Sequence, residues 1–124
     1  ARIGPHMFLK NGKCVIAGGS PSVSLQENMT QNAINLLDFG MSIEDAVHKP
    51  RFGGSSMSKP GATIMEPDMP AAMIKRLEKS GAKLDIVNPW NWVNGSYDSI
   101  YTDPNTGIAH ACGDPRRTAM AIAV

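Results

Sequence analysis

The sequence predicts a mixed α+β fold, because hairpin, helix and strand signals follow one another along the chain. A two-residue turn signal lies between two strand-like runs near the N-terminus, and a long amphipathic stretch follows it. The remaining helix and strand signals are interspersed, and no internal repeat is present. We therefore expect residues 1–124 to form a single domain or part of one.

The first predicted element is a β-hairpin. Residues 7–10 and 14–17 are strand-like, and the Asn11-Gly12 pair between them tolerates the positive φ that a tight hairpin turn requires. The glycine-rich run from Gly18 to Ser22 is then predicted to turn away from the strand and lead into a helix.

Three helices are predicted. Apolar side chains recur at helical spacing in residues 24–39. A shorter helix begins at Ser42, whose side chain suits an N-cap, and Pro50 prevents its continuation. Asp68 is predicted to cap a third helix, which ends near residue 79.

Four further strands are predicted from short runs of apolar and β-branched residues. They span residues 63–65, 83–87, 98–101 and 108–112. The small, polar, glycine-rich residues 53–61 predict a loop, and residues 103–107 predict the turn of a second hairpin.

The composition is that of an ordinary globular domain, with 42% hydrophobic residues, 19% charged residues and a formal net charge of +1. Lys and Arg are scattered among Asp and Glu, so no nucleic-acid partner is expected. No apolar run is long enough to span a membrane, so no membrane partner is expected either, and the compartment stays open. We expect Cys14 and Cys112 to be small buried side chains, with a single disulfide as the alternative.

No self-contained catalytic or metal site is recognisable. His6, His48 and His110 lack the close spacing of metal-ligand pairs, so we expect structural roles for them. Ser20 is followed by proline, and its surroundings do not match the nucleophile elbow G-x-S-x-G. The backbone of residues 18–22 has two interpretations, an oxyanion-binding turn with unpaired N–H groups or a glycine-rich connector.

Two other clusters of side chains suggest alternatives. For Arg51 and for Asp114-Pro115-Arg116-Arg117, structural ion pairs are the leading interpretation, and binding of a substrate carboxylate is the second. Trp90 and Trp92 are expected to cover an edge of the core, with closure of a pocket as the alternative.

An ordered series of motifs resembles the gamma-glutamyltransferase family. In chain order the motifs are Gly19-Ser20-Pro21, Leu37-Asp38-Phe39-Gly40-Met41, Glu44-Asp45-Ala46, Lys49-Pro50-Arg51-Phe52, Asp103-Pro104-Asn105-Thr106-Gly107 and Ala111-Cys112-Gly113-Asp114-Pro115-Arg116-Arg117. They cover nearly the whole chain, with spacings that chance would not readily reproduce. The resemblance implies the αββα sandwich of N-terminal-nucleophile (Ntn) hydrolases, incomplete in this chain and completed by a partner segment.

The resemblance also implies amide hydrolysis or acyl transfer through a threonine that self-cleavage of a precursor releases at a new N-terminus. Ala1 aligns downstream of that threonine, so we expect no catalytic side chain in this chain. The implied partners are a small-molecule amide substrate, the large subunit and the missing N-terminal part of the small subunit, all chains coming from one precursor. No metal and no organic cofactor are implied.

The chain departs from the family pattern in two places. Ser22 and Val23 stand where the family has a glycine pair whose amides form the oxyanion hole, so their backbone amides are the candidates for that role. Ala1 and Arg2 stand where the family has the serine pair that holds the glutamyl carboxylate, which leaves Arg2 as a candidate substrate-binding residue. We therefore expect a small carboxylated amide as substrate rather than glutathione.

Other interpretations remain open. The run Ser55-Ser56-Met57-Ser58 is similar to the missing serine motif, but it follows the helices instead of preceding the hairpin, so we expect a coincidence. A non-catalytic homologue or structural subunit with a degenerate site is the main alternative to the enzyme. An unrelated small α+β binding module is a third possibility, which stable folding of the chain alone would favour.

Overall fold

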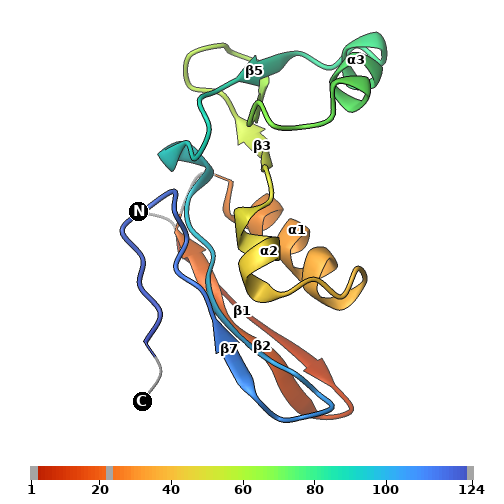
Figure 1. Ribbon diagram of the computed structural model, residues 1–124. Coiled ribbons are helices and arrows are strands. Elements are labelled where there is room, and N and C mark those ends of the chain that lie inside the picture. Colours follow the sequence, from red (N-terminus) through yellow and green to blue (C-terminus); the bar gives the residue numbers. More distant parts are fainter. Residues whose placement is uncertain (1–2, 22–23, 123–124) are drawn as a thin grey trace.

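The computed structural model describes residues 3–21 and 24–122, and it has the predicted mixed α+β fold (Figure 1). The larger sheet has four antiparallel strands in the order β1-β2-β6-β7, and the smaller sheet has three strands in the order β3-β4-β5. Helices α1 and α2 pack on one face of the larger sheet. Among the described residues, no helix is long and apolar enough to cross a membrane.

Strands β1 (Ile3–Lys10) and β2 (Lys13–Pro21) form the predicted hairpin. Asn11 and Gly12 have φ values of 52° and 75°, which confirms the two-residue turn between the strands.

The predicted turn at Gly18 is wrong, because β2 continues to Pro21. Gly18 pairs with β1 on one side and with Ser99 of β6 on the other. A Cβ atom at Gly18 would overlap the carbonyl oxygen of Asp98. Glycine at this position therefore permits close approach of two strands and does not mark a turn.

Strands β6 (Asp98–Thr102) and β7 (Ala109–Ala111) agree with the predicted second hairpin. The Gly107 N–H donates to the Asp103 carbonyl oxygen at 2.8 Å and closes the connecting turn.

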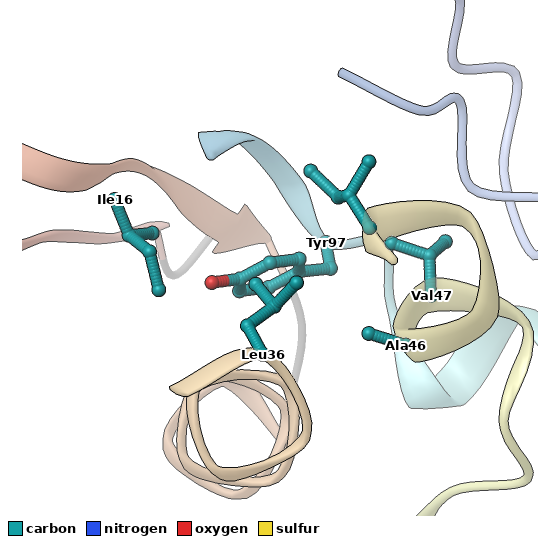
Figure 2. Close-up of a cluster of buried hydrophobic side chains, with 6 residues drawn as sticks. Ile16, Leu36, Ala46, Val47 and Tyr97 are labelled. Carbon is teal, nitrogen blue, oxygen red and sulfur yellow. The ribbon is translucent and has the colours of Figure 1, made fainter. Parts of the chain in front are cut away.

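Helices α1 (Leu25–Leu37) and α2 (Ile43–His48) agree with the first two predicted helices. The Asp45 N–H donates to Ser42 Oγ at 3.0 Å, as expected of the serine N-cap. The main core lies between these helices and the larger sheet, and its buried members are Ile16, Leu36, Ile43, Ala46, Val47 and Tyr97 (Figure 2). Burial of a large apolar side chain stabilises the fold by roughly 1.5–3 kcal/mol, so this cluster fixes both helices on the sheet.

The smaller sheet comprises β3 (Phe52–Ser55), β4 (Thr63–Met65) and β5 (Leu84–Ile86). Strands β4 and β5 confirm two predicted strands, and they run parallel to each other. Strand β3 lies where a loop was predicted, so that prediction is wrong for residues 53–55.

Side chains of α1 hold the backbone of β3 in place. The contacts are Gln31 Nε2 to the Phe52 oxygen at 2.6 Å, the Gly54 N–H to Glu27 Oε1 at 3.1 Å, and Ser24 Oγ to the Gly53 oxygen at 3.0 Å. A helix thus takes the place of a neighbouring strand along this edge. Local composition could not reveal these bonds, because their partners lie more than 20 residues earlier in the chain.

Helix α3 (Ala71–Lys79) confirms the third predicted helix, but its start differs. Its N-cap is Pro70, so the prediction that Asp68 caps it is wrong. None of the residues of α3 is buried. A single 3₁₀ turn, η1 (Trp92–Asn94), was not predicted.

The two cysteines are free. Cys14 is exposed, which contradicts the prediction that it is buried, and Cys112 is partly buried.

The face of the larger sheet opposite the helices is apolar. Met7, Ala17 and Ile100 form a row across three strands on this face. Met7 and Ile100 are 63% and 51% exposed, and residues 119–122 line a groove on this face together with Ala17 and Ile100. An apolar sheet face of this kind requires a covering layer, as in a sandwich with a second sheet.

Two glycines with matched backbone conformation test the contact between α1 and β3. Gly54 has φ +74° and Gly61 has φ +78°. A Cβ atom would overlap Ser24 Oγ at Gly54 and would meet nothing within 4 Å at Gly61. We expect Gly61→Ala to lower the free energy of unfolding by about 1 kcal/mol through backbone strain alone, and Gly54→Ala to lower it by about 2 kcal/mol more. Urea denaturation of both variants measures the difference, and equal losses would contradict the packing of α1 on β3.

Candidate functional site

The candidate site lies where β2 ends and α1 begins. Ser22 and Val23, the predicted oxyanion residues, lie outside the described part of the chain, and so does Arg2. The neighbouring side chains of Ser20 and Ser24 are fully buried. The site is therefore defined by the elements that flank residues 22 and 23.

A buried asparagine connects these elements to the η1 turn. Asn28 Nδ2 donates to Ser20 Oγ at 3.2 Å and also to the carbonyl oxygen of Asn94. Asn94 Nδ2 in turn donates to Glu66 Oε1 at 3.0 Å. The end of β2, the first turns of α1 and η1 are thus joined by one chain of hydrogen bonds.

Four buried charged side chains lie at the other end of this chain of bonds. Arg51, Glu66, Asp114 and Arg116 are each at most 3% exposed. Arg116 binds Glu66 through two parallel contacts of 2.6 Å, Nε to Oε1 and Nη2 to Oε2. Arg51 Nη2 lies 2.6 Å from Asp114 Oδ2. Two positive and two negative charges balance, as burial requires.

Backbone groups complete the cluster. Asp114 accepts the N–H groups of Tyr97 at 2.8 Å and Arg116 at 3.0 Å. Arg116 also donates to the carbonyl oxygens of Val47 at 2.9 Å and Lys49 at 2.8 Å. The C-terminal segment is therefore fixed to the end of α2 and to the start of β6. The leading interpretation of Arg51, Asp114 and Arg116 as structural ion pairs is confirmed.

The surroundings of this cluster set the pKa values of its members. Burial alone would raise the pKa of Glu66, but the hydrogen bonds from Arg116 and Asn94 outweigh burial and lower it. Burial lowers the pKa of Arg51, and the Asp114 carboxylate opposes that effect.

Arg117 differs from its neighbour. Its side chain is exposed, and Nη2 donates to the Trp92 carbonyl oxygen at 3.3 Å. Among the described residues no carboxylate pairs with it, so the ion-pair interpretation is wrong for Arg117.

The two tryptophans cover arginines and not the apolar core, so the prediction for them is wrong. The Arg116 guanidinium lies 4.9 Å from the ring centroid of Trp90, and that of Arg117 lies 5.8 Å from Trp92. Trp90 is 43% exposed and Trp92 is 61% exposed.

The three histidines have the structural contacts that were expected of them. His6 Nε2 lies 3.1 Å from the Tyr97 hydroxyl, His48 Nδ1 lies 2.8 Å from the Glu44 carbonyl oxygen, and His110 stacks on Tyr101. Burial lowers the pKa of His6. The described residues contain no group of three or more His, Cys, Asp or Glu side chains that could hold a metal ion.

The serine motif of residues 55–58 is occupied by a carboxylate of the chain itself. Ser56 Oγ and Ser58 Oγ donate to Asp85 Oδ2 at 2.5 and 2.8 Å. Hydrogen bonds from Lys59 and from these serines lower the pKa of Asp85 to about 2. A substrate carboxylate would be repelled here, which favours the interpretation of this motif as a coincidence.

Sequence reasoning missed Glu66, Asn28 and Asn94. Glu66 directly follows the buried strand β4, a position from which a carboxylate can reach the interior. Asn28 and Asn32 are four residues apart among the apolar positions of α1, so they share the buried face of the helix. Asn94 gave no signal, because its role depends on contacts across 28 and 66 residues of sequence.

Comparison with known proteins shows the family to which this chain belongs. The family model for gamma-glutamyltranspeptidase matches residues 2–124. The glutathione hydrolase proenzyme of Escherichia coli K12 is 28% identical over 113 residues, which are 90% of this chain and 18% of that protein.

Solved structures agree. A mutant of Helicobacter pylori gamma-glutamyltranspeptidase matches with a TM-score of 0.75 and 29% identity, over 93% of this chain and 61% of that chain. The Pseudomonas nitroreducens gamma-glutamyltranspeptidase complexed with L-DON has a TM-score of 0.77 at 18% identity, over 98% and 62% of the two chains, and shows the shared fold.

The fold is therefore that of the Ntn-hydrolase class, represented here by part of its α+β architecture. Within that class, the chain belongs to the gamma-glutamyltranspeptidase family. It spans about three fifths of these two solved chains and about a fifth of the curated proenzyme.

The buried carboxylate of Glu66 provides a stability test. Glu66→Gln leaves two buried guanidinium groups with one carboxylate, so we expect the free energy of unfolding at pH 7 to fall by about 3 kcal/mol. Because the pKa of Glu66 is lowered in the folded protein, its stabilising effect is complete above the unfolded value of about 4.3 and is lost as the pH falls through the folded value. The difference between wild type and variant should therefore shrink in acid.

Urea denaturation at pH 7 and at pH 3 measures this difference. Glu78→Gln, on the exposed surface of α3, is the matched control and should change the stability by less than about 0.5 kcal/mol. Equal stability of the two variants would show that the ion pair is not required.

Proposed function

We propose that this chain is the C-terminal portion of a small subunit of a gamma-glutamyltransferase-like amide hydrolase or acyltransferase. The observation that carries the proposal is the family match over residues 2–124, with the Asp114-Arg116 segment bound into the core. The apolar face of the larger sheet, on which Met7 and Ile100 are more than half exposed, supports a second layer from the remainder of the protein.

The catalytic group in this proposal is a threonine outside this chain. Its terminal amine, with a pKa near neutrality, removes the proton of its own hydroxyl, and the oxygen attacks the amide carbonyl. The C–N bond then breaks, the amine leaves with a proton, and an ester-linked acyl group remains on the threonine. Water or a second amine attacks that ester and releases the product.

The role of this chain is to stabilise the oxyanion formed in both steps. The backbone N–H groups of Ser22 and Val23 are the proposed donors. Support comes from their neighbours, because β2 ends at Pro21, α1 begins at Leu25, and Asn28 ties Ser20 to η1. A pre-organised donor pair of this kind typically contributes 10²–10³-fold in rate per donor.

The proposed substrate is a small carboxylated amide. Ala1 and Arg2 replace the serine pair that holds the glutamyl carboxylate in the family, so the usual contact of gamma-glutamyl substrates is absent from these positions. Arg2 stays a candidate for binding the substrate.

A second candidate function is a non-catalytic subunit that keeps the scaffold. Ser22 and Val23 in place of the glycine pair favour it, because a β-branched side chain restricts the backbone and crowds the acyl group.

Intact-mass analysis of the full-length gene product tests the proposal. We expect two polypeptides in a native complex, one of which begins with threonine and contains this sequence. Substitution of that threonine by alanine should leave the precursor uncleaved and abolish release of p-nitroaniline from acyl p-nitroanilides. An uncleaved wild-type protein without amidase activity would favour the non-catalytic subunit.

A further inference from the structure

A groove lies between the larger sheet and residues 119–122, here called the C-terminal wall. The groove is on the sheet face opposite the helices, and Figure 1 shows the C-terminal wall descending beside β7. The volume of the groove is about 410 Å³. Small-molecule sites typically span about 300–1,000 Å³, so the groove is large enough for a small ligand.

The C-terminal wall is held in place by groups outside the groove. Asp114 and Arg116 belong to the buried ion-pair cluster, and the Ala119 N–H donates to the Arg117 carbonyl oxygen at 2.9 Å. The chain also folds back closely on Gly113, where a Cβ atom would lie 2.6 Å from the Ala119 carbonyl oxygen. The groove therefore does not depend on direct packing of its two walls against each other.

Small apolar side chains keep the groove open. Ala17 and Ala111 line it from the sheet, and Ala119 and Ala121 line it from the C-terminal wall. Ile100 adds a larger apolar surface and is 51% exposed. An apolar chain placed in the groove would cover surface that the described residues leave exposed to water, and this burial favours binding.

Asp98 is the one charged side chain among the described residues that line the groove. It is exposed, and its Oδ2 accepts from Ser96 Oγ at 2.7 Å. In the described part of the chain no Lys, Arg or His forms an ion pair with it. A carboxylate beside apolar walls and without a basic neighbour in the groove attracts a cation and repels an anion.

We infer that this groove binds a small organic cation, which consists of a primary ammonium group on a short apolar chain. The ammonium group donates to the Asp98 carboxylate, and the chain lies against Ile100 and the alanines of the two walls. A charge-assisted hydrogen bond of this kind is stronger than a neutral one, and apolar walls that exclude water strengthen it further. The inference does not rest on the proposed reaction, whose substrate carries the opposite charge.

Calorimetric titration of the full-length protein tests the inference with three ligands of similar shape, n-butylammonium chloride, 1-butanol and sodium butyrate. We expect saturable binding of butylammonium, roughly tenfold weaker binding of butanol and no binding of butyrate, because the ligands differ in charge at the end that meets Asp98. Pentylammonium should bind roughly fourfold more tightly than butylammonium, because one more CH₂ group is buried. Asp98→Asn should weaken butylammonium binding about tenfold and leave butanol binding unchanged.

Matched variants separate the groove from its surroundings. Ala111→Leu places a larger side chain in the groove and should abolish butylammonium binding. Ala109→Leu makes the same change two residues earlier on β7, at an exposed position that does not line the groove, and should leave the affinity unchanged. Asp68→Asn removes an exposed carboxylate outside the groove and should also leave it unchanged.

The full-length protein is the decisive material, because a second layer over this sheet face either closes the groove into a pocket or fills it. Absence of butylammonium binding to the full-length protein would show that the groove is filled and would overturn the inference. Equal affinity in wild type and Asp98→Asn, or equal affinity for butylammonium and butanol in wild type, would also overturn it. The comparison of ligands in wild type stays informative even if a variant fails to fold.

Discussion

The buried double ion pair of Arg51, Glu66, Asp114 and Arg116 is the constraint on which the rest of the structure depends. Removing charges from water costs several kcal/mol per ion, and that cost is offset only if each charge finds close partners. All four are paired here within 2.6 Å, and backbone groups take further bonds. The network places residues 114–116 in contact with the end of α2, the start of β6 and the residue after β4, so it joins the two sheets.

The same network reaches the candidate site. Glu66 binds Asn94, Asn94 accepts from Asn28, and Asn28 donates to Ser20 at the end of β2. A buried charge cluster is thus linked by hydrogen bonds to a strand end that it does not touch. The Asp-Pro-Arg segment and the end of β2 belong to one network, although they lie about 90 residues apart in the chain.

Local signals predicted much of the fold. The Asn11-Gly12 pair predicted the hairpin and the apolar periodicity predicted α1, because both signals depend on neighbouring residues. The family motifs, which are spread along the chain, predicted the fold class. The errors fall where distant contacts decide. Strand β3 is extended because α1 binds its backbone, and Gly18 is a strand residue because β6 approaches it closely. Trp92 was predicted to cover a core edge and Arg117 to form an ion pair. The two exposed side chains instead stack on each other.

Hydrogen exchange of the Asp114→Asn variant, followed by mass spectrometry, tests the central claim most directly. The substitution keeps the shape of the side chain and leaves Arg51 without its 2.6 Å partner. If the network joins the two sheets, amide protection should fall together in α2, in β4 and around Tyr97, whose N–H donates to Asp114. Faster exchange confined to residues 113–117 would contradict the account.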